Sequence, residues 1–306
     1  MQIICVIYLF FITLQRKSTR LSTFDIPLST QMIGIFDSGY GGLTIFNHIR
    51  QRLPQYDYLY LGDNARAPYG TRSFDVIYEY TLQAVSYLRE QGCSLIILAC
   101  NTASAKALRT IQQNDINPDE VRVLGVIRPT VEVVPTRTRT NHIGVLATPG
   151  TVASESYIIE LQKQKADLVI TQQACPMWVP LIESGEHLHE GADYFIEKYL
   201  TELLERDPQI DTIILGCTHY PLLQEKIEAF LAKQTISQQS ISVIAQGEIV
   251  AESLADYLER HADIAKRAIL GSTGSCTFLT TEAANKFSDS ASLFLDKKIE
   301  AKKIEL

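Results

Sequence analysis

The chain has 306 residues, an apolar fraction of 46% and a formal net charge of -7 at pH 7. This length favours two domains, and with no long basic block the chain is not expected to bind nucleic acid. Its six cysteines show no Cys-x-x-Cys spacing, which argues against a metal cluster or a disulfide framework and favours a reducing, cytoplasmic compartment.

Residues 1–31 differ from the rest of the chain. An apolar run over residues 3–14 is too short to span a bilayer comfortably, and its basic residues follow it instead of preceding it as in a secretory signal. We therefore expect residues 1–31 to be a leader outside the fold. Either an extension from an upstream start or a weak membrane anchor would account for it.

Strands and helices are predicted to alternate from residue 32 onward. In the first half the predicted strands cover residues 32–36, 58–61, 95–99 and 121–127, and the predicted helices cover 43–52, 73–91 and 102–113. In the second half the strands cover 143–146, 168–171 and 212–215, the helices cover 130–134, 151–164 and 192–205, and 173–180 is a loop. Beyond these, a strand at 241–245, a helix at 248–261, a break at 271–275, a strand at 276–279, a helix at 281–295 and a frayed helix end at 297–306 are expected.

Two pairs of segments repeat in the same order along the chain. Residues 95–104 and 212–221 are apolar runs that end in Cys100 and Cys217, and residues 33–42 and 143–152 share an Ile-Gly start and a later hydroxyl residue. Such repeats predict two similar α/β domains with mainly parallel sheets, related by a pseudo-two-fold axis, with the active site in the cleft between them. The expected domains are residues 32–127 with 240–306, and residues 128–239.

The two cysteines suggest a chemistry. If the halves face each other, Cys100 and Cys217 enter one cleft from opposite walls, where one sulfur removes a proton from carbon and the other delivers one. A helix N-terminus is expected to lower a cysteine pKa and so to supply a thiolate base near neutral pH. A single cysteine is more often an inert apolar side chain, but two at equivalent strand ends favour function.

Polar residues surround both cysteine turns. Asp37 hydrogen-bonds a substrate ammonium, raises the basicity of a neighbouring thiol, or caps a helix. His219 stabilises a thiolate, shuttles its proton, or is structural. Hydroxyl and amide side chains at helix starts suit a carboxylate ligand. They are Ser38, Asn101, Thr102, Thr148, Thr151 and Thr218. No lysine or phosphate-binding loop supports a cofactor, so none is expected, and residues 186–190 are better explained as a polar helix edge than as a metal site.

Several of these motifs together resemble glutamate racemases, from about residue 32 to residue 294. They are Asp37-Ser38-Gly39-x-Gly41-Gly42, Pro68-Tyr69-Gly70, Cys100-Asn101-Thr102-Ala103-Ser104, Thr148-x-x-Thr151 and Gly216-Cys217-Thr218-His219-Tyr220-Pro221. The resemblance implies a cofactor-independent racemase of glutamate, whose D-form is a building block of peptidoglycan. It also leaves room for a homodimer.

The resemblance implies roles for individual residues. Cys100 and Cys217 are the acid/base pair, and Asp37, Glu183 and His219 assist proton movement. Substrate is held by Asp37, Ser38, Pro68, Tyr69, Gly70, Asn101, Thr102, Thr148, Thr151, Thr218 and His219. Cys175 has no catalytic role in this pattern.

The chain departs from the family pattern at Arg128 and at Ala245-Gln246, which we expect to affect domain closure or assembly. Three alternatives stay open from the sequence. The substrate is aspartate or a related amino acid; Cys217 and His219 form the nucleophile and base of a hydrolase or isomerase; or the chain is a non-catalytic amino-acid-binding module.

Overall fold

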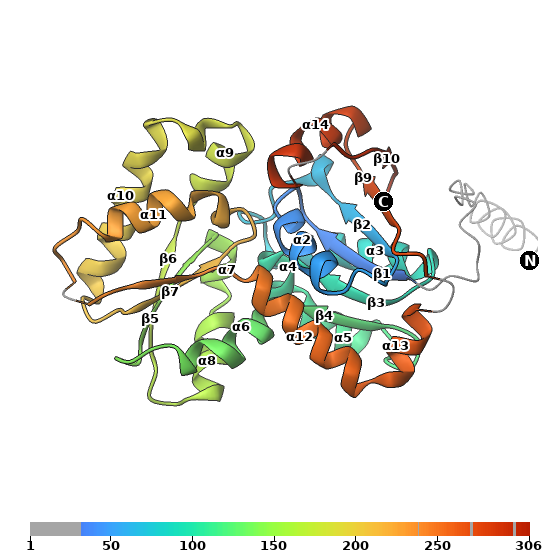
Figure 1. The fold of residues 1–306 in the computed structure, drawn as a ribbon, viewed down its shortest axis with the longest axis horizontal. Coiled ribbons are helices and arrows are strands. Elements are labelled where there is room, and N and C mark those ends of the chain that lie inside the picture. Colours follow the sequence, from blue (N-terminus) through green and yellow to red (C-terminus); the bar gives the residue numbers. More distant parts are fainter. Residues whose placement is uncertain (1–31, 238, 270–271, 296–297) are drawn as a thin grey trace, which may run out of the picture.

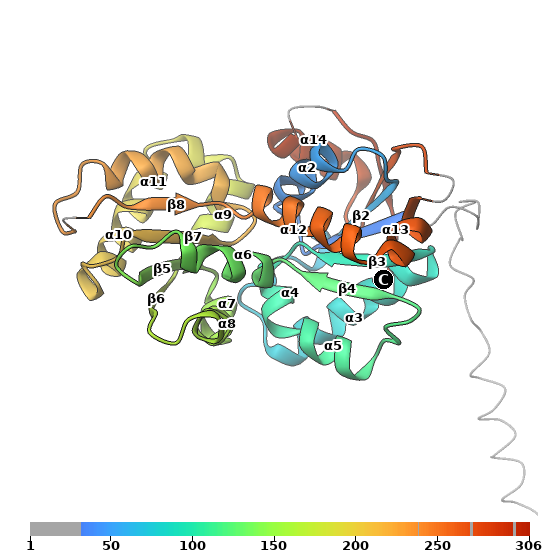
Figure 2. The same cartoon turned by 60° about the horizontal axis from the view of Figure 1, so that its bottom comes forward.

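The computed structural model describes residues 32–237, 239–269, 272–295 and 298–306. Two lobes lie side by side, each built on a parallel sheet with helices on both faces (Figures 1 and 2). The predicted α/β class with two parallel sheets is therefore confirmed. The predicted leader, residues 1–31, lies outside the described residues. No described helix has the length and apolar character needed to cross a membrane.

The larger sheet has six strands in the order β10-β9-β2-β1-β3-β4. These are β1 (Met32–Asp37), β2 (Tyr58–Gly62), β3 (Cys93–Leu98), β4 (Arg122–Gly125), β9 (Cys276–Thr280) and β10 (Ala301–Lys303). One face packs on α2 (Gly42–Arg52), α12 (Gly247–Arg260), α13 (Ala262–Ile269) and α14 (Ala284–Leu295). The other packs on α3 (Phe74–Glu90), α4 (Asn101–Lys106) and α5 (Leu108–Asn114). Strand side chains point alternately to the two faces, so each face has its own apolar core.

The smaller sheet has four strands in the order β6-β5-β7-β8. These are β5 (His142–Ala147), β6 (Val169–Ala174), β7 (Thr212–Gly216) and β8 (Ser242–Ile244). One face packs on α9 (Trp178–Glu183), α10 (Gly191–Arg206) and α11 (Gln224–Leu231). The other packs on α6 (Ile127–Val133) and α8 (Ser156–Gln164), and α7 (Pro149–Ala153) lies at the seam with α4. Short 3-10 turns lie at Asn64–Arg66, Val134–Thr136, Glu186–Leu188 and Tyr220–Leu223.

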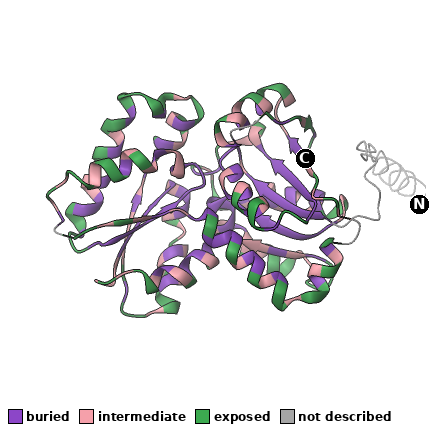
Figure 3. Cartoon of the chain, viewed as in Figure 1, coloured by how far each residue is buried: buried purple, intermediate pink, exposed green. Residues whose placement is uncertain are grey.

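The strand order explains the repeat. The run β2-β1-β3-β4 in the larger sheet corresponds to β6-β5-β7-β8 in the smaller one, so β5 is equivalent to β1 and β7 to β3. After β4 the chain crosses into the second lobe through α6, and after β8 it returns through α12. Buried residues concentrate on the strands and where the lobes meet (Figure 3).

The chain returns to the first lobe later than the prediction placed it. Residues 240–306 were assigned to the first domain, but β8 pairs in parallel with β7 in the smaller sheet, and only α12 and later elements lie with the first lobe. The expected frayed helix end is also wrong. There, β10 pairs with β9, and Ile299 and Ile304 beside it are buried.

Several predicted helix and strand boundaries are wrong for local reasons. Glu155 adopts a left-handed conformation with φ of 54°, which divides the predicted helix 151–164 into α7 and α8. Pro129 was expected to end a strand, but it lies in the first turn of α6, where a missing N–H costs no helical hydrogen bond. The predicted helix 102–113 is interrupted at Ala107, between α4 and α5. The predicted loop 173–180 contains the end of β6 and the start of α9.

Candidate functional site

A small cavity lies where the carboxyl ends of strands from both lobes meet. Its volume is about 90 Å³, which is too little for a nucleotide or a peptide. Both Cys100 and Cys217 line it, as the sequence predicted for a cleft between two halves. The other lining residues among the predicted set are Ser38, Pro68, Tyr69, Gly70, Asn101, Thr102, Thr148, Glu183, Thr218 and His219.

Direct contacts between the lobes surround this cavity. Gly150 donates its backbone N–H to the Gly70 carbonyl over 2.7 Å, and Thr44 Oγ1 donates to the Thr218 carbonyl over 2.9 Å. A Cβ on Gly41 would lie 2.3 Å from His219 Nδ1, so the first lobe approaches the second closely only because residue 41 is glycine. These contacts hold the two walls of the cavity against each other.

Cys100 is buried at the N-terminal end of α4. Its sulfur accepts the N–H of Ala103 over 3.5 Å and lies 3.2 Å from Ser38 Oγ. Burial raises the pKa of Cys100 to about 12, and the Asp37 carboxylate adds to the rise, while the contacts with Ser38 and Ala103 oppose it. The predicted lowering of the pKa is therefore wrong for Cys100, because desolvation outweighs the helix N-terminus. At neutral pH this residue is a thiol.

Cys217 belongs to a chain of three side chains. Its sulfur lies 3.9 Å from Nδ1 of His219, and Nε2 of the same ring lies 3.0 Å from Oε1 of Glu183. Burial of His219 favours its neutral form, but the hydrogen bonds with Cys217 and Glu183 outweigh it and raise the His219 pKa to about 10. At neutral pH His219 is therefore a cation, held between a sulfur and a partly exposed carboxylate.

Asp37 lies behind the cavity wall and is fully buried. Its Oδ2 accepts the Gly39 N–H over 2.9 Å, and no hydrogen-bond partner for Oδ1 is found within the described part of the chain. Burial raises the pKa of Asp37, although the positive charge of His219 acts in the opposite direction. Asp37 is placed to influence Cys100 and His219 electrostatically, but it does not line the cavity.

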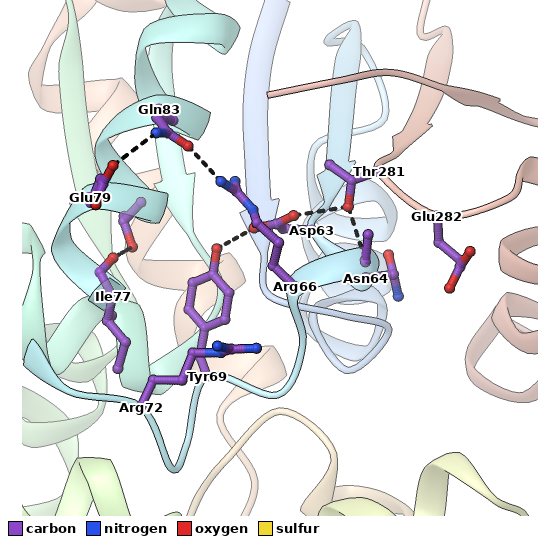
Figure 4. Close-up of polar contacts among 12 residues, drawn as sticks. Asp63, Asn64, Arg66, Tyr69, Arg72, Ile77, Glu79, Gln83, Thr281 and Glu282 are labelled. Carbon is purple, nitrogen blue, oxygen red and sulfur yellow. Dashed lines mark hydrogen bonds and ion pairs between the residues drawn. The ribbon is translucent and has the colours of Figure 1, made fainter. Parts of the chain in front are cut away.

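The predicted Pro68-Tyr69-Gly70 loop is held by a buried carboxylate that the sequence analysis left unassigned. Asp63 follows β2, and its Oδ2 accepts hydrogen bonds from Tyr69 Oη over 2.5 Å and from Arg66 Nε over 2.6 Å (Figure 4). Its Oδ1 accepts from Thr281 Oγ1 over 2.9 Å. Asp63 thus anchors the loop to the first lobe. Its position directly after a strand is the sequence feature that could have indicated it.

The predicted hydroxyl residues fall into two groups. Thr102 and Thr148 line the cavity, and their Oγ1 atoms meet across the lobes at 2.9 Å. Thr151 is fully buried behind them, with its Oγ1 atom 3.3 Å from that of Thr102 and 3.1 Å from that of Thr148. Thr151 therefore supports the site without lining the cavity.

Sequence reasoning missed several lining residues around α9. Cys175, Pro176, Val179 and Pro180 line the cavity, as do Gly39, Ala67, Thr71 and Pro149. The segment was predicted to be a loop, so the α9 side chains had no assigned direction. Nearby, His187 is buried instead of lying on the polar helix edge expected for residues 186–190.

A larger hollow of about 520 Å³ lies elsewhere, between β4, α5, α6 and α12. Arg128, the first departure noted in the sequence, is at its edge and pairs with Glu132 at 2.8 Å on the surface of α6. Neither Cys100 nor Cys217 lines this hollow. The chemistry of the side chains, and not the volume, therefore identifies the smaller cavity as the candidate active site.

Comparisons with known proteins agree with this assignment. The family model for Asp/Glu/Hydantoin racemases matches residues 43–254. A glutamate racemase of Roseobacter denitrificans is 41% identical over 278 residues, which cover 88% of this chain and 98% of that protein. The structure of the glutamate racemase isoform RacE1 from Bacillus anthracis matches with a TM-score of 0.80 and 30% identity, over 91% of this chain and 98% of that one. The glutamate racemase of Francisella tularensis, solved in complex with D-glutamate, matches with a TM-score of 0.78 and 29% identity over the same shares.

Proposed function

The chain belongs to the Asp/Glu/Hydantoin racemase family, and we propose that it interconverts L- and D-glutamate by moving a proton at the α-carbon. The observation that carries the mechanism is that Cys100 and Cys217 line one small cavity from different lobes. Inversion of a stereocentre requires a proton to leave one face and another to arrive on the opposite face. Two sulfurs on opposing walls meet that requirement without a cofactor.

The surroundings of the two cysteines differ. Burial raises the pKa of Cys100, so we propose it as the resting acid. The Cys217 sulfur lies 3.9 Å from Nδ1 of His219, a ring that can exchange a proton with it, so we propose Cys217 as the resting base. When the thiolate removes the α-proton, the opposite thiol donates one, and the roles are exchanged for the substrate of the other hand.

The α-proton is a weak acid, and the site stabilises the carbanion by position and desolvation. We propose that the hydroxyl and amide groups of Ser38, Asn101, Thr102, Thr148 and Thr218, with the Pro68-Tyr69-Gly70 loop, hold the substrate. Developing negative charge on the carboxylate is favoured near the N-terminal ends of α4 and α7. Asp37 and Glu183 adjust the charge of the site through Cys100 and His219, while Thr151 positions the hydroxyl pair in front of it.

Catalysis at the seam of two lobes makes closure part of the mechanism. We propose that residues 32–127 with the segment from α12 onward form one domain, and that residues 128–245 form the other. Closing the lobes excludes water and strengthens each electrostatic contact in the cavity. We further propose that the enzyme works in the cytoplasm and supplies D-glutamate for peptidoglycan.

Incubation of the purified chain with L-glutamate, without added cofactor, tests the proposal through the decay of the circular dichroism signal toward zero. Variants Cys100→Ala and Cys217→Ala should each lose racemisation by several orders of magnitude. Parallel incubation with L-aspartate decides the substrate. No loss of signal from L-glutamate, or full turnover in either variant, would refute the proposal.

A further inference from the structure

Gln246 lies at the second crossing between the lobes, directly before α12, and is buried. Its Oε1 accepts a hydrogen bond from Asn101 Nδ2 over 2.7 Å. Its Nε2 donates to Tyr157 Oη over 2.9 Å and to Thr130 Oγ1 over 2.8 Å, and it also lies 3.3 Å from the Val126 carbonyl. One side chain therefore contacts three other side chains and one backbone carbonyl deep inside the protein.

Three of these residues form a closed ring. Asn101 donates to Gln246, Gln246 donates to Tyr157, and Tyr157 Oη donates to Asn101 Oδ1 over 2.7 Å. All three side chains are buried, so breaking one bond leaves a polar group without water to replace its partner. The ring thus fixes the plane of the Asn101 amide at both its oxygen and its nitrogen.

The ring also joins the parts of the chain that connect the lobes. Asn101 follows Cys100 and lines the cavity, and Tyr157 comes from α8 in the second lobe. Val126 precedes α6 at the first crossing, as Gln246 precedes α12 at the second, so the two equivalent positions meet.

Gly247, which follows Gln246, brings the start of α12 against α2. A Cβ on Gly247 would lie 2.2 Å from Cδ2 of the exposed His48 side chain, so the two helices pack closely here. The ring is therefore next to a close helix contact.

We propose that Gln246 is a positioning residue for the racemisation, acting through the amide of Asn101. This inference rests on the proposed function. The ring orients the remaining hydrogen and lone pair of the Asn101 amide for the substrate, and it holds the two crossings together while the lobes close. Gln246 itself does not line the cavity. The sequence had marked this position as a departure from the family pattern.

Gln246→Met keeps the length of the side chain and removes all its hydrogen bonds. We expect kcat/KM to fall by about 10- to 100-fold for both enantiomers, mainly through KM, because Asn101 would hold the ground state and the transition state alike. A surface control is Gln112→Met, since Gln112 is exposed and donates one hydrogen bond to the Val123 carbonyl inside the first lobe. That variant should keep KM and kcat.

Gln246→Glu supplies a readout that a merely structural role would not move. A protonated carboxyl donates to Tyr157 as the amide does, whereas a carboxylate does not. The KM of this variant should therefore rise with increasing pH in a range where the wild-type KM is constant. Because the substitution preserves shape, it also tests the ring if the methionine variant fails to fold.

Hydrogen exchange measured by mass spectrometry separates this inference from the proposed function. Gln246→Met should speed amide exchange in peptides covering residues 101–106 and 126–133 relative to Gln112→Met, whether or not the wild type racemises glutamate. An inactive wild type with this exchange pattern would refute the function and retain the ring. Wild-type KM and kcat in Gln246→Met, or exchange no faster than in the control, would overturn the inference.

Discussion

The contacts with Cys217 and, second, with Glu183 raise the pKa of His219, and neutralising the Glu183 carboxylate gives a quantitative test. The Glu183 Oε1 atom lies 3.0 Å from His219 Nε2, and the His219 pKa is raised to about 10. A group with a raised pKa keeps its proton below that value and loses it above. The kcat/KM of the wild type should therefore fall as the pH rises through about 10.

Gln at position 183 keeps a hydrogen bond but removes the negative charge. An opposite charge within about 4–6 Å shifts a pKa by about one to three units, and the partial exposure of Glu183 places its effect in the lower part of that range. In Glu183→Gln the alkaline fall in kcat/KM should therefore move down by about one to two pH units. The assay is the pH dependence of kcat/KM for wild type and variant under identical buffers.

Glu132→Gln is the control for this experiment, because Glu132 pairs with Arg128 on the surface of α6, away from the cavity. The substrate amino group titrates identically in all three proteins, so only the difference between their profiles counts. An unchanged alkaline limb in Glu183→Gln would refute the contribution of Glu183 to the His219 charge. A limb that moves upward would contradict the sign of the effect.

Two further substitutions test how the lobes and the loop are held. Gly41→Ala should lower kcat/KM at least about tenfold, because its Cβ would lie 2.3 Å from His219 Nδ1. The control Gly191→Ala, whose Cβ would have nothing within 4 Å, should have little effect. Steady-state kinetics of the folded variants tests this, and equal kcat/KM values in the two variants would contradict close packing of the lobes. Tyr69→Phe removes the 2.5 Å hydrogen bond to buried Asp63 and should lower the free energy of unfolding by about 1.5–3 kcal/mol. Urea titration measures this change, and an unchanged urea midpoint of unfolding would show that the bond does not anchor the loop.

The sequence predicted the parts of the fold that depend on local pattern. The apolar runs that end in Cys100 and Cys217 correspond to the equivalent strands β3 and β7, and the repeated segments 33–42 and 143–152 contain β1 and β5. The prediction placed the fourth strand of the smaller sheet in the wrong half. β8 is only Ser242–Ile244, and its pairing with β7 is a contact between distant segments that no local pattern specifies.

The candidate site was predictable where it lies at strand ends, and less so where it depends on packing. Ser38 and Thr148 follow strands directly and Cys100 lies two residues after one, so their meeting at one cavity follows from a parallel fold. The raised pKa of Cys100 was not predicted, because it arises from burial by both lobes and not from the nearby helix. The partners of Gln246 were not predictable either, because they come from three segments that are distant in the sequence.

The central claim is that one sulfur removes the α-proton and the other supplies its replacement. Racemisation of L-glutamate in heavy water, stopped at low conversion, tests it by mass spectrometry of the separated enantiomers. The account predicts one solvent deuterium in nearly every D-glutamate formed and almost none in the remaining L-glutamate. Deuterium that enters both enantiomers equally from the start, or the original protium retained in the product, would show that a single group serves both faces.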